Sequence, residues 1–210
     1  MNTHKITTKS HWCEHLYHEY HSQDSDTLMI VLGGQNYSIH MPLLYYTTCL
    51  GIQSGIDVLA VNYGFIQNPT KTHFPEDFEV LYKEVKEAVD LVITEHHKNL
   101  VFVGKSLGTV LIKRLKREYP HLSHKIIFLT PVSPAFDTDD LKEKLILMGA
   151  GDTHYDENLL NKEEESVVIE FNDGDHSLET GNVLADLEIM EQVMGAISGY
   201  LDYEIGEEQD

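Results

Sequence analysis

Apolar residues form short continuous runs and helical stripes, and the two patterns alternate from residue 27 onward. A short apolar run indicates a buried strand, and apolar residues three and four positions apart indicate the covered face of a helix. The runs predict strands over residues 28–32, 57–62, 99–103, 125–130, 145–148 and 166–171. The stripes predict helices over residues 42–50, 75–97, 107–118 and 183–201. This alternation predicts an α/β fold with a mostly parallel central sheet, covered by helices on both faces.

The first 26 residues show a less regular pattern. Residues 6–10 and 13–20 are expected to form an antiparallel pair of strands at one edge of the sheet. Neither an internal repeat nor a low-complexity linker divides the 210 residues, so we expect a single domain of residues 1–210 with an acidic tail over 203–210.

One pentapeptide points to chemistry. Residues 104–108 read G-K-S-L-G, which is a G-x-S-x-G motif, and they stand between a predicted strand and a predicted helix. A strand, a tight turn and a helix form a nucleophile elbow, which raises the serine oxygen above the carboxyl edge of a sheet. The motif also arises by chance as an ordinary Gly/Ser turn, but this context favours Ser106 as a nucleophile.

A serine nucleophile needs a base and a group that orients the base. In elbow enzymes the chain order is serine, acid and histidine. Asp152 follows the predicted strand at 145–148, and His176 follows the last predicted strand. Each alone is an ordinary loop residue, but their order and positions predict a Ser106–Asp152–His176 triad. Three rivals for the acid follow the preceding strand: Asp137, Asp139 and Asp140.

An acyl-transfer site also needs two backbone N–H groups that stabilise an oxyanion. The N–H of Leu107, directly after the serine, is the first candidate. The second is expected from the loop after the strand at 28–32, where Gly34 is favoured and Gln35 follows it. The alternative is that Gly33 and Gly34 only form the turn.

On these residues the chain resembles the α/β-hydrolase superfamily from about residue 27 to 201. Within it, the chain is similar to small, lidless serine hydrolases of the dienelactone hydrolase and carboxylesterase type. The sequence G-D-H-S at 174–177 is similar to that of an uncharacterised bacterial branch. The resemblance implies an eight-stranded sheet whose second strand is antiparallel, and it implies the roles of nucleophile, acid and base for Ser106, Asp152 and His176.

The chain departs from the family pattern in two places. Leu32-Gly33 stands where relatives often have His-Gly, which affects the oxyanion loop. Many relatives insert a lid at the position of residues 131–144. In this chain that segment is short, so we expect no large cap domain.

Charge and composition restrict the classes of binding partner that we expect. The chain has 15 Lys+Arg against 35 Asp+Glu, a net charge of −20 that disfavours nucleic acids and anionic membranes. The simplest interpretation of this charge is a well-solvated surface. The apolar runs are too short to span a membrane, the N-terminus lacks a signal-peptide core, and two cysteines indicate no disulfide framework. We therefore expect a cytoplasmic location.

Neither a metal nor a cofactor is expected. His11 and His15 have H-x-x-x-H spacing, but no Glu follows His11 to complete a zinc motif. Nothing matches a nucleotide-binding glycine pattern, and Lys105 is expected to point beside the site.

The leading hypothesis is a serine hydrolase that cleaves an ester or related acyl bond of a small molecule through an acyl-enzyme. The alternative is a catalytically weak or inactive binding or scaffold protein of the same fold. The residues do not separate ester, thioester, lactone and peptide bonds.

Overall fold

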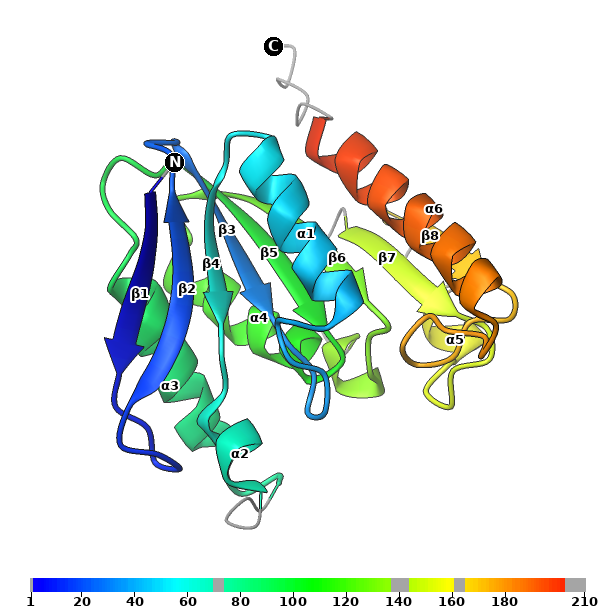
Figure 1. Cartoon of the computed structure of the whole chain (residues 1–210), viewed down its shortest axis with the longest axis horizontal. Coiled ribbons are helices and arrows are strands. Elements are labelled where there is room, and N and C mark those ends of the chain that lie inside the picture. The colour runs from blue at the N-terminus through cyan, green and yellow to red at the C-terminus, as the bar shows by residue number, and fades with distance from the viewer. Residues whose placement is uncertain (1, 70–73, 137–143, 161–164, 203–210) are drawn as a thin grey trace.

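The computed structural model describes residues 2–69, 74–136, 144–160 and 165–202. Its eight strands form one sheet in the order β1-β2-β4-β3-β5-β6-β7-β8 (Figure 1). The strands are β1 (Asn2–Thr8), β2 (Leu16–Ser22), β3 (Thr27–Leu32), β4 (Asp57–Val61), β5 (Asn99–Lys105), β6 (Ser123–Leu129), β7 (Lys144–Gly149) and β8 (Val167–Phe171). The helices are α1 (Pro42–Gln53), α2 (Gly64–Gln67), α3 (Phe78–Asp90), α4 (Leu107–Glu118), the 3-10 helix η2 (Ser133–Ala135), α5 (Glu157–Leu160) and α6 (Val183–Asp202).

The sheet is mostly parallel. β2 pairs antiparallel with both β1 and β4, whereas all pairs from β4 to β8 are parallel. The predicted fold class and the antiparallel second strand are therefore confirmed. The N-terminal strands lie at the edge of the sheet, and β1 begins at Asn2, four residues before the predicted start.

Two apolar cores cover the two faces of the sheet. Leu28, Ile30 and Leu32 of β3 pack into the core that holds α3 and α4, and Met29 and Val31 pack into the core that holds α1 and α6. In Figure 1, α1 and α6 lie in front of the sheet and α3 and α4 behind it. Burial on both faces explains why these strands are continuous apolar runs rather than alternating ones.

The predicted helix at residues 75–97 is wrong at both ends, because α3 spans only Phe78–Asp90. After α3 the chain turns, and the Thr94 N–H donates a hydrogen bond to Nδ1 of His97 at 3.0 Å. His97 is buried, with Nε2 3.4 Å from Oδ2 of Asp57, so this segment closes the amino end of the sheet instead of continuing the helix.

The carboxyl ends of the parallel strands meet at one edge of the sheet, which is where open α/β sheets bind ligands. Among the described residues, the link from β6 to β7 contains only η2, and no large cap covers this edge. Residues 137–143 of this link lie outside the described residues. No described helix has the length and apolar character needed to cross a membrane.

Candidate active site

Ser106 stands at a sharp turn between β5 and α4. Its φ of 52° and ψ of −113° lie in a region that L-residues rarely adopt. At this turn the start of α4 packs directly against the sheet. A Cβ on Gly108 would lie 2.5 Å from the Leu32 carbonyl oxygen, and one on Gly104 would lie 2.6 Å from Cδ1 of Ile112. The local geometry is therefore that of a nucleophile elbow, with both glycines required by close packing.

The structure brings together the three side chains that the sequence singled out. Nε2 of His176 lies 2.9 Å from Oγ of Ser106, and Nδ1 of His176 lies 2.6 Å from Oδ2 of Asp152. They come from three loops, after β5, after β7 and after β8. A base between a hydroxyl and a carboxylate is arranged to remove the proton of the serine.

Each carboxylate oxygen of Asp152 has its own hydrogen-bond partner. Oδ1 accepts a hydrogen bond from the His154 N–H at 2.8 Å, which leaves Oδ2 for His176. The Asp152 side chain is fully shielded from solvent, whereas that of His176 is 30% exposed. A buried carboxylate with one free oxygen fixes the imidazole as the tautomer that carries its proton on Nδ1.

The environment of His176 favours the neutral imidazole. Burial lowers the pKa of His176 below its ordinary value of 6.5, and the charges of Lys105 and His154 also lower it. The hydrogen bond and charge of Asp152 act in the opposite direction. The net lowering leaves His176 unprotonated, and so able to accept a proton, at neutral pH.

The oxyanion prediction needs a correction at Gly34. Its backbone lies against Ser106, but its N–H donates a hydrogen bond to the Tyr37 carbonyl at 2.9 Å and is not free. Gly34 and Tyr37 form an isolated β-bridge that closes the loop after β3, which the pattern of apolar residues did not reveal. The next N–H, that of Gln35, makes no hydrogen bond within the described part of the chain. Leu107 is the first residue of α4, where the N–H has no partner within the helix.

Two further residues hold the His176 loop, and the sequence analysis did not assign them this role. The His176 carbonyl accepts hydrogen bonds from Nζ of Lys105 at 2.7 Å and from Oγ1 of Thr130 at 3.0 Å. Both donors are buried at strand ends next to the elbow, and Thr130 has a φ of 42°. The signal in the sequence that could have identified them is a polar residue at the end of a buried, apolar strand.

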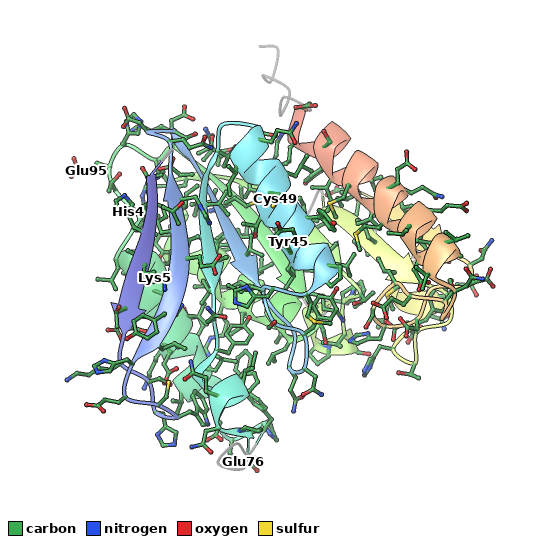
Figure 2. All side chains as sticks on the ribbon, in the orientation of Figure 1. His4, Lys5, Tyr45, Cys49, Glu76 and Glu95 are labelled. Carbon is green, nitrogen blue, oxygen red and sulfur yellow. The ribbon has the colours of Figure 1, made fainter. Side chains whose placement is uncertain are left out.

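The remaining candidates lie elsewhere. Asp137, Asp139 and Asp140, the rival acids, are outside the described residues. Figure 2 shows His4 on β1, and β1 lies at the opposite end of the sheet from β7 and β8. His11 and His15, which stand between β1 and β2, therefore do not join the loops that carry Asp152 and His176.

The comparisons with known proteins found matches by structure only. No family model matches the chain, and no curated protein matches its sequence. A serine hydrolase without a lid from Xanthomonas campestris superposes with a TM-score of 0.70, at 15% identity, covering 97% of both chains. A protein of unknown function from Agrobacterium tumefaciens, described as an α/β hydrolase, superposes with a TM-score of 0.73, at 16% identity, covering 94% of both chains. The chain has the α/β-hydrolase fold.

An esterase from Pyrococcus furiosus has the same α/β-hydrolase fold. It superposes with a TM-score of 0.67, at 14% identity, covering 98% of this chain and 93% of the esterase. At such low identities the likeness establishes the architecture, and the chemistry must be argued from the side chains of this α/β-hydrolase fold.

Proposed function

We propose that this chain is a serine hydrolase that cleaves an ester or related acyl bond of a small molecule. The observation that carries the proposal is the continuous hydrogen-bonded chain from Oγ of Ser106 through His176 to the buried Asp152. Its support comes from the strained elbow and from the position of the site at the carboxyl edge of the sheet.

In the proposed reaction, Oγ of Ser106 attacks the carbonyl carbon while Nε2 of His176 takes the hydroxyl proton. Asp152 stabilises the imidazolium that forms. The N–H of Leu107, with that of Gln35 in place of Gly34, stabilises the oxyanion of the tetrahedral intermediate. His176 then returns the proton to the leaving alcohol. A water molecule, activated by His176, hydrolyses the acyl-enzyme and restores Ser106.

A binding or scaffold protein of the same fold is the competing hypothesis. Such a protein has no need of a buried acid, a base and a hydroxyl in hydrogen-bond contact. Labelling with a fluorophosphonate, followed by peptide mapping, separates the two hypotheses. We expect one modified peptide, which contains Ser106. A folded protein that resists the probe and hydrolyses no p-nitrophenyl ester would favour the scaffold.

The pH dependence of catalysis should follow His176. Because the base must be unprotonated, kcat/KM rises with pH through the pKa of His176 in the free enzyme. Since that pKa is lowered, activity persists at mildly acidic pH, where an ordinary histidine is mostly protonated. The measurement is kcat/KM for p-nitrophenyl acetate across the acid and neutral range. The His4→Gln variant, altered at an exposed site on β1, should give the same profile. An acid limb centred above 6.5 would contradict the assignment.

The proposed site is expected to show little preference for long acyl chains. No large cap is described above the sheet edge, so little apolar wall is available to bury an acyl chain. Full burial of one methylene contributes about 0.8 kcal/mol, which corresponds to about a fourfold increase in kcat/KM. Each methylene added to the acyl chain should therefore raise kcat/KM by less than this factor. Rates on p-nitrophenyl esters of increasing length should peak at short chains, without activation at a lipid interface. A steep rise toward long acyl chains would show that a wall exists.

A further inference from the structure

Lys105 is a buried lysine beside the proposed nucleophile. It is the last residue of β5 and is only 1% exposed. Lysine is seldom fully buried without a partner, because taking an ammonium out of water carries a large free-energy cost. A lysine in this position therefore needs a structural or functional reason.

The contacts of Lys105 lead to the base rather than to the serine. Nζ donates a hydrogen bond to the His176 carbonyl at 2.7 Å and lies 5.0 Å from the ring centre of Tyr37. Within the described residues, no carboxylate forms an ion pair with this ammonium. The lysine side chain thus links the residue that precedes Ser106 directly to the backbone of His176.

We propose that Lys105 is a positioning residue, which fixes the His176 loop against the elbow and holds its positive charge beside that loop. This inference rests on the proposed hydrolase function and deepens it. Lys105 acts through His176 and is not itself a nucleophile or a base, because its hydrogen bond is directed to a backbone carbonyl.

The charge distinguishes Lys105 from its neighbour Thr130. Both side chains donate to the same carbonyl, so a hydrogen bond alone did not require a lysine. Burial lowers the pKa of Lys105 to about 8, while the charges of Asp152 and Asp175 raise it, so the ammonium is largely protonated at neutral pH. Among the described charged or titratable groups that act on the pKa of His176, Asp152 raises it, and Lys105 and His154 lower it.

The test compares four variants. Lys105→Met removes the charge and the donor, and Lys105→Gln removes the charge but keeps a donor. Thr130→Val removes the second donor without a change of charge. Lys86→Met is the matched control, since it removes one ammonium on α3 that pairs with Asp90 of the same helix. Thermal unfolding of each variant verifies that it is folded.

We expect Lys105→Met to lower the plateau of kcat/KM for p-nitrophenyl acetate by roughly 10- to 100-fold, because the base is no longer held in place. Its acid limb should move to higher pH, because a positive charge near His176 is lost. Lys105→Gln should show the same shift with a smaller loss of rate. Thr130→Val should lower the rate without moving the acid limb, and Lys86→Met should change neither.

An acid limb unchanged in folded Lys105→Gln would overturn the inference while leaving the hydrolase function intact. If the wild-type protein neither hydrolyses esters nor reacts with fluorophosphonate, the proposed function fails instead. In that case an NMR titration of the His176 ring, in wild type and Lys105→Gln, still decides the role of the lysine. A higher pKa of His176 in the variant supports the inference, and an equal or lower pKa overturns it.

Discussion

Replacing Ser106 with alanine is expected to lower kcat for p-nitrophenyl acetate by about 10⁶-fold and to abolish fluorophosphonate labelling. The loss is large because Oγ of Ser106, 2.9 Å from Nε2 of His176, is the nucleophile of the proposed reaction. Labelling and hydrolysis should be measured on the same preparations of wild type and variant. Undiminished labelling of Ser106→Ala would identify a different nucleophile.

Ser106→Gly provides a matched control for the backbone of the elbow. The φ of 52° is unfavourable for serine and alanine but not for glycine. Ser106→Gly should therefore unfold at a higher temperature than Ser106→Ala, by an amount that corresponds to about 1 kcal/mol. Equal melting temperatures would indicate that the turn is not strained in solution.

Replacing Asp152 with asparagine is expected to lower kcat by about 10⁴-fold at neutral pH, with the fold preserved. Oδ1 accepts the His154 N–H, so the amide of an asparagine would turn its oxygen to that N–H and its NH₂ group toward Nδ1 of His176. The imidazole would then carry its proton on Nε2, where it faces Ser106 and cannot accept a proton. The measurement is kcat for p-nitrophenyl acetate, with far-UV circular dichroism to verify folding.

Other acids serve as controls for Asp152. Asp175→Asn removes a carboxylate that accepts hydrogen bonds from the N–H groups of Ser177 and Glu179 within the His176 loop. This variant should lower kcat far less than Asp152→Asn does. Substitutions of Asp137, Asp139 and Asp140 by asparagine should leave kcat near the wild-type value. A loss at any of these three that equals the loss at Asp152 would transfer the role of the acid to that loop.

The sequence alone determined the architecture, because the physics that specifies it is local. A strand buried on both faces must be apolar at every position, as residues 28–32 are, and an amphipathic helix must repeat its apolar residues every three to four positions. The elbow was equally readable, since its strand, turn and helix lie next to one another in the chain. Asp152 and His176 could be selected because each follows a predicted strand, and the carboxyl ends of parallel strands meet at one edge of a sheet.

Only the tertiary structure decided which polar groups are available and which are already bonded. α3 ends at Asp90, and the segment that follows it places His97 next to Asp57, a residue 40 positions away. The N–H of Gly34 is consumed by Tyr37 in a bridge that no apolar pattern encodes. Lys105, whose residue type predicts exposure, is buried because the His176 loop, 71 positions later in the chain, supplies its hydrogen-bond acceptor. Contacts between segments far apart in sequence determine the hydrogen-bond partners of such groups, and residue type and periodicity carry no information about them.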